Sequence, residues 1–484
     1  MNPRCELILP ADLHDQLQRH LFPGDSDEHG AVLLADLAAT GDTTRILARE
    51  LVLARDGSDF LPGRLGYRML NADFVTEQIL RSRNERLAYL AIHNHGGAET
   101  VAFSAIDLAS HERGYPALLD IVRGIPVGAL VLATDAIAGD IWLAGGQRLS
   151  LDRAVILGPP RRVLTAAPVA SPHLKDRAFD RQTRLLGDRG QALLRELRVG
   201  VIGAGGVGSL LIEFLARLGV GELVVIDPDR ATLTNLPRLV GAARLDALAW
   251  LTNERRPVWL RRLGARCARS KVGLARRQVR RAGFTPVFTG VVGDVLEPTI
   301  ATHLISCDYL FLAADSMQVR LLVNAITQQY LIPAYQVGAK AQVKKDSGEL
   351  LDVFSVVRPM FPGPGCLWCN GLIPPRLLQE EAATAMDRNQ QRYVDDPSVR
   401  VPSVITLNAV AAAHAANDFL FAVTGLAESG PLRDYLYMHP RERSVRFDRP
   451  RVDPACPECG TGLASRRARG DSRPLPVRAT SAMA

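Results

Sequence analysis

The chain has 484 residues, 47% of them hydrophobic, and a formal net charge of +7 at pH 7. A chain of this length exceeds what one ordinary hydrophobic core holds, so we expect two domains. No apolar stretch is long enough to cross a membrane, and the first residues carry acidic side chains in place of an apolar signal core. We therefore expect a cytoplasmic protein that has no membrane partner.

The first segment, residues 1–145, mixes helical stretches with strand-like apolar runs at residues 31–37, 86–92 and 128–134. The second run leads directly into His93 and His95. Residues i and i+2 of a strand share a face, so both imidazoles can meet one metal ion. Ser104 and Asp107 follow on an expected helix, where residues i and i+3 lie one above the other. Two histidines and one aspartate would make a three-ligand zinc site with an open position, the arrangement of catalytic zinc.

This pattern resembles the JAMM metalloprotease motif H-x-H-P-x7-S-x-x-D of ubiquitin isopeptidases, with its spacing kept. The resemblance implies a smaller α/β, deubiquitinase-like domain in which Glu28 is the general base and Ser104 stabilises the oxyanion. Asp27 is the weaker candidate for the base. Gly96 departs from the family because it replaces the motif's proline. The S-x-x-D pattern is also a helix capping box, so a domain that only binds its partner is the alternative.

Residues 146–175 are rich in proline and lack periodicity, and we interpret them as a linker. Beyond it, residues 176–463 alternate apolar runs with helices, which is typical of a doubly wound parallel sheet. The runs are residues 197–204, 221–227, 285–292 and 307–315. Residues 464–484 have a composition typical of disorder. The predicted fold class is therefore α/β, with a Rossmann-like domain after the smaller N-terminal domain.

A glycine-rich turn follows the first run of the second domain, and its glycines are Gly203, Gly205, Gly206 and Gly208. Glycines allow the backbone to approach a phosphate, and the helix that follows offers free N–H groups and a positive dipole end. The next run ends at Asp227, nineteen residues after Gly208, where a carboxylate can bind ribose hydroxyls. This much fits an NAD-linked oxidoreductase as well as an enzyme that uses ATP.

Five further polar residues follow in order, namely Asp229, Asn235, Arg238, Lys271 and Asp315. Attack of a carboxylate on a phosphate brings two anions together. The reaction therefore needs cations to offset the repulsion and an acidic residue to hold magnesium, whereas hydride transfer needs neither. The set favours the ATP enzyme.

The ordered set resembles the ThiF-type adenylating family, which includes the activators of sulfur-carrier proteins and the ubiquitin-activating enzymes. The segment from Arg177 to Gln182 resembles its R-Y-x-R-Q stretch, and Asp315, Arg320 and Asn324 resemble its D-N-x-x-x-R-x-x-x-N stretch. The resemblance implies a homodimer in which Arg181 reaches into the partner's ATP site as an arginine finger. It also implies that Asp315 holds Mg²⁺ and that Asp227 binds the ribose. The residues expected at the phosphates are Asn235, Arg238 and Lys271.

Four of the seven cysteines form two C-x-x-C pairs, namely Cys366 with Cys369 and Cys456 with Cys459. Four thiolates suit a closed tetrahedral zinc, which is structural rather than catalytic, and the ThiF-type family carries such a zinc. Redox chemistry of the pairs is the alternative. Many relatives pass the adenylated protein to a cysteine in the loop after the first pair, and that loop has none here. Cys267, which lies between arginines, is the remaining candidate for a thioester.

Residues 255–281 contain eleven Lys or Arg and no acidic residue. A solvated basic face is the simplest interpretation, and an acidic protein partner is the alternative. No nucleic-acid motif accompanies the run, so we expect no nucleic-acid partner.

These resemblances predict an enzyme that uses ATP, Mg²⁺ and Zn²⁺ to adenylate the C-terminal carboxylate of a ubiquitin-like or sulfur-carrier protein ending in glycine. The N-terminal domain is expected to cleave the same carrier from precursors or conjugates, and a conjugating enzyme is a further expected partner. An NAD-linked oxidoreductase and a catalytically inactive scaffold for a ubiquitin-like protein are the alternatives. The identity of the carrier, and whether the product is a conjugate or a thiocarboxylate, stay open.

Overall fold

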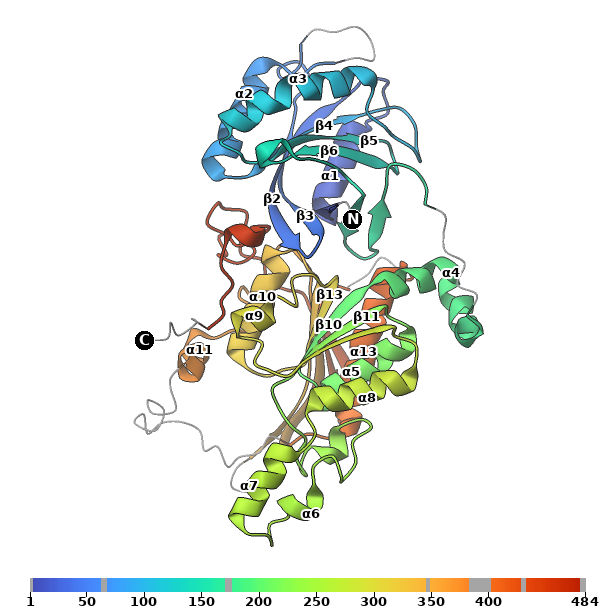
Figure 1. Ribbon diagram of the computed structural model, residues 1–484, viewed down its shortest axis with the longest axis vertical. Coiled ribbons are helices and arrows are strands. Elements are labelled where there is room, and N and C mark those ends of the chain that lie inside the picture. Colours follow the sequence, from blue (N-terminus) through green and yellow to red (C-terminus); the bar gives the residue numbers. More distant parts are fainter. Residues whose placement is uncertain are drawn as a thin grey trace. The chain divides into compact units, whose positions relative to one another are not determined.

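The computed structural model describes residues 3–61, 68–169, 176–344, 349–382, 402–427 and 432–478. The chain divides into two compact units. Unit 1 comprises Met1–Ala170, Gln328–Leu331 and Gly460–Pro474, and unit 2 comprises Ser171–Thr327, Ile332–Cys459 and Leu475–Ala484. Both units are α/β, as predicted (Figure 1). None of the described helices combines the length and the apolar character that a membrane crossing needs.

Unit 2 is built on an eight-stranded sheet of order β12-β11-β10-β13-β14-β15-β16-β17. The first five strands of that order pair in parallel and the rest pair antiparallel. All four predicted runs are strands of the parallel part, so the doubly wound arrangement is confirmed. The strands are β10 (Arg198–Ile202), β11 (Glu222–Ile226), β12 (Val287–Val291), β13 (Tyr309–Leu312), β14 (Ala334–Val343), β15 (Leu350–Met360), β16 (Tyr435–His439) and β17 (Ser444–Asp448).

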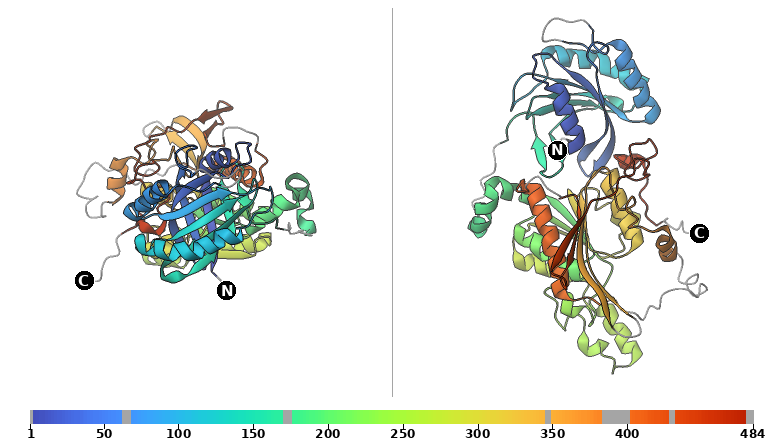
Figure 2. Two further views of the ribbon diagram at one scale, coloured as in Figure 1. Left: turned by 90° about the horizontal axis from the view of Figure 1, so that it is seen from above. Right: turned by 180° about the vertical axis from the view of Figure 1, so that it is seen from behind.

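Helices cover both faces of this sheet because its central strands are apolar throughout. On one face, α5, α8 and α13 pack with the strands into one continuous core. Helix α10 lies on the opposite face, as the front and rear views show (Figures 1 and 2). The helices are α4 (Asp180–Glu196), α5 (Gly206–Leu218), α6 (Ala249–Thr252), α7 (Val258–Cys267), α8 (Lys271–Ala282), α9 (Pro298–Ala301), α10 (Met317–Gln329), α11 (Pro375–Ala382) and α13 (Ile405–Thr424).

Unit 1 contains a nine-stranded sheet of order β7-β6-β5-β4-β2-β3-β1-β8-β9. The three predicted runs of this segment form β2, β4 and β5. The strands are β1 (Arg4–Pro10), β2 (Gly30–Thr40), β3 (Thr43–Leu53), β4 (Ala88–Asn94), β5 (Val127–Leu132), β6 (Ile137–Trp142), β7 (Arg148–Ser150), β8 (Arg153–Leu157) and β9 (Arg162–Leu164). Helix α1 (Ala11–Leu21) packs on one face, and α2 (Ala72–Glu85) and α3 (Ala105–Ile121) pack on the other.

The prediction that residues 146–175 form a linker is wrong for most of this segment. Residues 148–164 contain the last three strands of the sheet in unit 1. Strand β8 pairs in parallel with β1, so that Glu6 lies opposite Arg153. Their side chains form an ion pair at 2.7 Å. Ala154 and Ile156 are buried in the core. This short run has no alternating pattern because it is buried, and only its pairing with β1 reveals it as a strand. Residues 170–175 lie outside the described part.

The prediction that residues 464–484 form a disordered tail is also wrong for the described residues 464–478. Residues 460–474 belong to unit 1. Buried Arg49 of β3 donates hydrogen bonds to the carbonyl of Gly462 at 2.8 Å and to that of Arg467. Asp471 accepts from the backbone N–H of Ala39 at 2.7 Å. The segment is rich in arginine, yet these specific partners order it. Residues 479–484 lie outside the described part.

Candidate nucleotide and metal sites

The glycine-rich turn joins β10 to α5 and is too crowded for side chains at two positions. Gly203 has a φ of +91°, and a Cβ there would lie 3.0 Å from the carbonyl oxygen of Ala313. A Cβ on Gly208 would overlap the carbonyl oxygen of Gly203. The glycines therefore let α5 begin close against the end of the sheet, with its free N–H groups at that edge.

Asp227, at the end of β11, connects the turn to the neighbouring strand end. It is buried, and its carboxylate accepts hydrogen bonds from the backbone N–H of Ala204 at 2.7 Å and of Asp229 at 2.8 Å. Burial raises the pKa of Asp227, and the nearby Lys271 opposes that shift. The carboxylate thus lies beside the glycine turn, as the sequence predicted for a ribose ligand.

Lys271 lies at the start of α8 and points to the same strand end. Its Nζ donates to Asp229 Oδ2 at 2.6 Å and lies 3.7 Å from Asp227 Oδ1. Arg238 is half-buried. It lies next to the start of α5, because its Cδ would be 3.4 Å from a Cβ added to Gly206. Asn235 precedes Arg238 on the same 3-10 turn. Two cations and two carboxylates therefore gather at the edge of the sheet where the turn lies.

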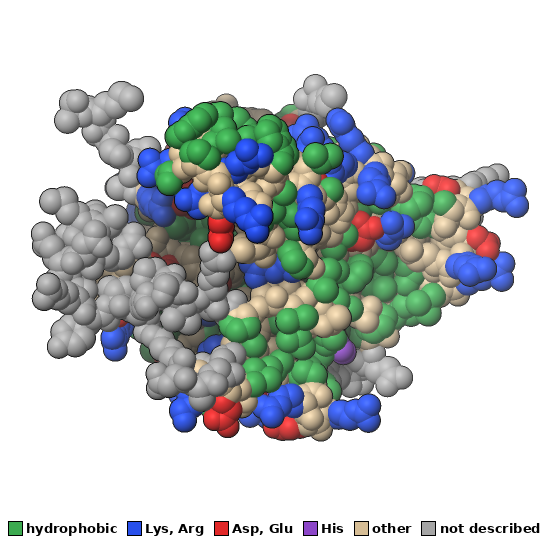
Figure 3. Space-filling model, turned by 90° about the horizontal axis from the view of Figure 1, so that it is seen from below, with side chains coloured by type: hydrophobic (Ala, Val, Ile, Leu, Met, Phe, Trp, Pro, Cys, Tyr) green, Lys and Arg blue, Asp and Glu red, His purple; other side chains and the backbone are tan. Residues whose placement is uncertain are grey.

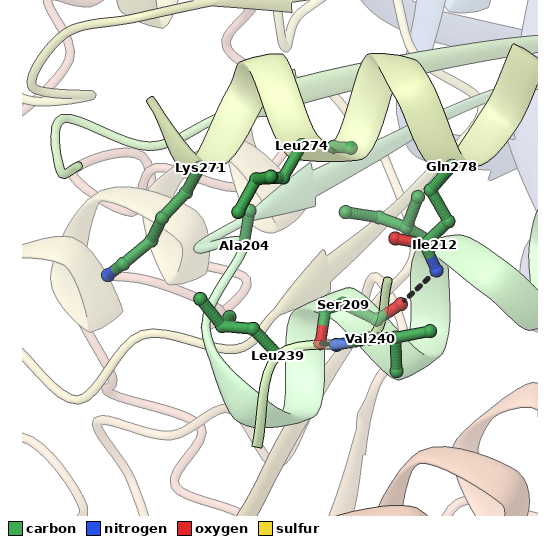
Figure 4. A pocket seen from close by; sticks show the side chains of 9 residues that line it. Ala204, Ser209, Ile212, Leu239, Val240, Lys271, Leu274 and Gln278 are labelled. Carbon is green, nitrogen blue, oxygen red and sulfur yellow. Dashed lines mark hydrogen bonds between the residues drawn. The ribbon is translucent and has the colours of Figure 1, made fainter. Parts of the chain in front are cut away.

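A small cavity adjoins Lys271 (Figure 4). Its walls are the apolar side chains of α5, α8 and the segment after Arg238. Gln278 donates from its amide to the carbonyl of Ser209 at 2.7 Å and closes one end. Lys271 lies at the other end in Figure 4. The lining residues are Ala204, Ser209, Ile212, Leu239, Val240, Lys271, Leu274, Ala275 and Gln278.

Asp315 follows β13 and is exposed just before α10. The helix that follows is capped from a distance by Glu381 of α11, which sequence reasoning did not single out. Its carboxylate accepts from the N–H groups of Met317 and Gln318 at 2.8 and 3.0 Å and from Ser316 Oγ at 2.8 Å. Glu381 therefore stabilises the first turn of α10 immediately beyond Asp315.

Arg320 and Asn324, the other two residues of the D…R…N stretch, do not lie with the phosphate-site residues. Arg320 donates to the carbonyl of Leu372 at 3.4 Å, and buried Asn324 accepts from the N–H of Leu367 at 3.0 Å. Both bonds hold the loop that carries the first cysteine pair. These two residues support the cysteine cluster.

The four cysteines of the two C-x-x-C pairs converge and are all buried. Their sulfurs lie 3.8 Å apart for Cys366 and Cys369, 3.7 Å for Cys366 and Cys456, and 3.4 Å for Cys369 and Cys459. Tetrahedral zinc with Zn–S bonds of about 2.3 Å requires separations of about 3.8 Å. Pairing with Cys366 lowers the pKa of Cys459 to about 5, whereas pairing with Cys459 raises the pKa of Cys366. The donor set fits a closed metal site.

Arg181 and Cys267 lie apart from these clusters. Arg181 is exposed in the first turn of α4, and no hydrogen bond or ion pair within the described residues joins it to the nucleotide-site residues. The neighbouring Gln182 donates to the carbonyl of Leu218 at 3.0 Å and fastens α4 to the end of α5. Cys267 is exposed at the end of α7, whereas Cys5 and Cys307 are buried.

In unit 1, His93, His95 and Asp107 converge at the end of β4 and the start of α3. The two Nε2 atoms lie 3.2 Å apart, and Asp107 Oδ2 lies 3.7 Å from that of His93 and 3.6 Å from that of His95. Tetrahedral zinc with bonds of about 2.0–2.1 Å requires separations of about 3.3–3.4 Å. The three atoms therefore fit a metal ion. His95 Nδ1 lies 3.0 Å from the carbonyl of Ala102, which holds the ring with Nε2 toward the cluster.

Ser104 caps α3 and orients Asp107. Its hydroxyl donates to Asp107 Oδ2 at 2.7 Å and accepts from the Asp107 N–H at 3.1 Å. The backbone N–H of Ser104 donates to the same carboxylate oxygen at 2.8 Å, which completes a capping box. The capping interpretation and the ligand interpretation of this pattern are thus compatible. The expected role of Ser104 at an oxyanion requires its hydroxyl to exchange that hydrogen bond.

The segment that carries Glu28 leads into β2, whose first residue, Gly30, lies opposite His93. The ring of His29 packs on His20 of α1, and its Nε2 lies 3.0 Å from Asp25. Glu28 and Asp27 precede the strand, so its register does not fix where their side chains point, and Glu28 stays the predicted base. Gly96 has no positive φ, and a Cβ there would meet open space, so the backbone does not require glycine at this position.

One network in unit 1 was missed by sequence reasoning. His111, four residues after Asp107 on α3, bonds through Nδ1 to Asp140 of β6 at 2.8 Å. Asp140 also accepts from Arg148 at 2.6 Å and from Trp142 at 3.2 Å. Burial alone would raise the pKa of Asp140, but these hydrogen bonds lower it to about 2. The network fixes α3 to the sheet and thereby positions Asp107. The spacing of four residues between Asp107 and His111, which puts both on one face of α3, was the sequence signal that could have pointed to His111.

The fold is that of a doubly wound α/β protein with a glycine-rich turn between its first parallel strand and the helix that follows. The sequence profile of the ThiF family matches residues 179–461, and the chain belongs to this family.

Several curated proteins are similar over part of their length. The chain is 51% identical over 55 residues to the SAMP-activating enzyme E1 of Haloferax volcanii, covering 11% of this chain and 20% of that one. It is 28% identical over 148 residues to the sulfur carrier protein ThiS adenylyltransferase of Bacillus subtilis, covering 31% and 39%. It is 25% identical over 187 residues to the tRNA threonylcarbamoyladenosine dehydratase of Escherichia coli, covering 37% and 60%. The chain thus spans between a fifth and three fifths of these relatives. Among solved structures, E. coli MccB has a TM-score of 0.44 at 17% identity, over 60% of this chain and 75% of that one.

Proposed function

We propose that unit 2 uses ATP to adenylate the C-terminal carboxylate of a ubiquitin-like or sulfur-carrier protein. The observation that carries this proposal is Lys271, whose Nζ lies 2.6 Å from Asp229 beside the glycine turn. Hydride transfer in an NAD-linked oxidoreductase does not need a lysine at this position, whereas the attack of one anion on another needs a cation to offset their repulsion.

In the proposed reaction a carboxylate oxygen of the carrier attacks the α-phosphorus of ATP, and the bond from that phosphorus to the bridging oxygen of pyrophosphate breaks. The products are the acyl adenylate and pyrophosphate. Lys271 and Arg238 offset the negative charge that the phosphoryl oxygens gain, and the N-terminus of α5 adds its positive dipole. Asp315 would hold the magnesium of the nucleotide, and Asp227 would accept a hydrogen bond from a ribose hydroxyl. Lys271 then exchanges its present partner Asp229 for a phosphate oxygen.

The names of two relatives support this substrate class, since one is a SAMP-activating enzyme E1 and the other is an adenylyltransferase of the sulfur carrier protein ThiS. We further propose a homodimer in which Arg181 serves the ATP site of the partner subunit. Its exposure in the first turn of α4 is consistent with that role. Cys267 is the exposed cysteine that a transfer step to a conjugating enzyme would use.

For unit 1 we propose a zinc metallo-isopeptidase that releases the same carrier from precursors or conjugates. His93, His95 and Asp107 would hold a zinc ion, which would supply Lewis acidity toward a water and a carbonyl. Glu28, two residues before β2, would accept the proton of the attacking water and pass that proton to the leaving amine. Ser104 keeps Asp107 oriented. The cluster of four cysteines holds a second, structural zinc.

ATP–pyrophosphate exchange, measured with and without a candidate carrier protein that ends in glycine, tests the adenylation. Lys271→Ala should lower the carrier-dependent exchange rate by about 10²–10³-fold, because it removes charge stabilisation from the transition state. Arg280→Ala is the matched control, since Arg280 is an exposed cation on the same helix. Equal exchange rates in the two variants would show that Lys271 does not act in the reaction, and the adenylation proposal would then fail.

A further inference from the structure

The segment between Arg238 and Lys271 forms a helical hairpin of α6 and α7, and apart from Cys267 at the end of α7 none of its residues takes part in the proposed chemistry. Its two helices lie close together because Gly264 of α7 is buried against α6. A Cβ at that position would lie 2.8 Å from Leu251 Cβ and 3.0 Å from Thr252 Cγ2. The two helices of the hairpin are therefore closely packed against each other.

The base of the hairpin is held by an ionic cluster. Asp246 is buried and pairs with Arg269 at 3.0 Å and with Arg277 of α8 at 2.6 Å. The backbone N–H of Arg269 also donates to the carbonyl of Asp246 at 2.8 Å. Ser270 then caps α8, which begins with Lys271. The hairpin is thus fixed to the helix that carries the phosphate-site lysine.

Both helices of the hairpin expose large apolar side chains. The exposed fractions are 67% for Trp259, 58% for Trp250, 53% for Val258 and 49% for Leu263. Arg262 and Arg266 are exposed on the same side of α7 as Trp259, because they follow it at i+3 and i+7. Figure 3 looks onto this end of unit 2, where apolar side chains adjoin Lys and Arg side chains. We call this surface the Trp–Arg face.

The charge of the Trp–Arg face restricts its partner. Between Leu251 and Ala268 the chain has five arginines and a single acidic residue, Glu254. A second copy that docked the same face symmetrically would bring like charges together, which opposes association. Trp and Arg are the residues that contribute most to protein interfaces, and a basic surface attracts an acidic one.

We propose that the Trp–Arg face docks an acidic amphipathic segment of another protein. Apolar side chains of that segment pack on Val258, Trp259 and Leu263, and its carboxylates pair with Arg262 and Arg266. The arginines lie between Val258, Trp259 and Leu263 rather than opposite them, whereas a helix that lies on a membrane separates its polar and apolar faces. Nucleic acid would pair with the arginines but would gain nothing from Val258 or Leu263. This proposal does not depend on adenylation.

The size of the face indicates a transient complex. Helix α7 has ten residues and is about 15 Å long, so the hairpin buries less than the roughly 800 Å² that each partner of a stable complex buries.

The test is fluorescence anisotropy with the full chain and a labelled synthetic helical peptide that carries Leu at i, i+3, i+4 and i+7 and Glu elsewhere. We expect saturable binding that weakens with added salt, and none for the peptide in which every Glu is Lys. Arg262→Glu with Arg266→Glu should lower the affinity on the order of tenfold or more, and so should Trp259→Ala. Arg281→Glu, an exposed site at the end of α8, should leave the affinity unchanged.

Gly264→Val provides a second test, because it separates α7 from α6 while keeping every arginine, and it should also weaken the peptide. Thermal unfolding of each variant checks that the chain is folded. The proposal is overturned if the wild-type chain does not bind the Glu peptide, or if the variants at the Trp–Arg face bind this peptide as tightly as wild type does. It is equally overturned if phosphatidylserine vesicles or single-stranded DNA bind this face and the peptide does not.

Discussion

Asn324, buried in the middle of α10, accepts a hydrogen bond at 3.0 Å from the N–H of Leu367, which stands between Cys366 and Cys369. The same amide donates at 3.3 Å to Glu458, which stands between Cys456 and Cys459. One side chain therefore links both cysteine turns, and the order of the cysteine cluster depends on it.

Asn324→Ala should loosen the cysteine cluster. It leaves the buried N–H of Leu367 without its partner, which costs about 1–3 kcal/mol. We expect zinc bound there to be released to a colorimetric chelator several times faster than from wild type. Asn417→Ala, at an exposed position of α13, is the control. Equal release rates for the two variants would show that Asn324 does not support the cluster.

Arg181 should act on the partner subunit. Mixing Arg181→Ala chains with Lys271→Ala chains should restore ATP–pyrophosphate exchange, because a heterodimer contains one site with both residues intact. Neither variant alone should exceed background. Subunit exchange is followed with differently tagged chains. Exchange of subunits without return of activity would place Arg181 outside the neighbouring site.

The N-terminal cluster should hold one of two zinc ions in each chain, matching the two ligand groups of the described residues. His95→Ala should lose one zinc and all cleavage of a carrier fused through its C-terminal glycine. Glu28→Gln should keep both ions and lose nearly all cleavage, since it removes the proton acceptor.

His414→Ala, at an exposed histidine of α13, should keep both ions and full activity. Zinc content is measured by mass spectrometry of the metal. Wild-type chain with one zinc and no cleavage would reduce unit 1 to a binding domain.

Arg49→Met should release the C-terminal segment from unit 1. Arg49 is buried and donates to the carbonyls of Gly462 and Arg467, which a methionine cannot do. Trypsin should then cut at Arg466 and Arg467 faster, because these buried sites become accessible. Arg113→Met, an exposed position of α3, is the control. Unchanged protection of the segment would show that other contacts hold it.

Asp140 should make unit 1 sensitive to acid. Its pKa is lowered from 3.8 to about 2 in the folded chain. A depressed pKa contributes stability that is present above the unfolded value and is lost as the pH falls through the folded value. Wild type should therefore lose stability between about pH 4 and pH 2.

Asp140→Asn should be less stable at neutral pH and should show a flatter dependence in that window. Hydrogen exchange of α3 peptides in urea measures it, with exposed Asp135→Asn as the control. If the stability of Asp140→Asn falls with pH as steeply as that of wild type, another group is responsible for the acid sensitivity.

The sequence by itself determined the features whose parts are neighbours in the chain. The turn from Gly203 to Gly208 is required by a positive φ and a close backbone approach within six residues. His93 and His95 share a strand face, and Ser104 and Asp107 share a helix turn, because the period of each element sets those positions. The cysteine pairs carry their spacing in the same way. The roles expected of Asp227, Lys271 and Asp315 came from the family resemblance and stay predictions.

Only the tertiary structure decided the contacts between distant segments. Strand β8 is recognisable by its pairing with β1, and residues 460–474 are ordered by Arg49 and Ala39 of unit 1. Asn324 belongs to a family motif, yet its partners lie 43 and 134 residues away. Local propensity carries no information on such pairs, because their energy arises only when the folded chain brings the two groups together.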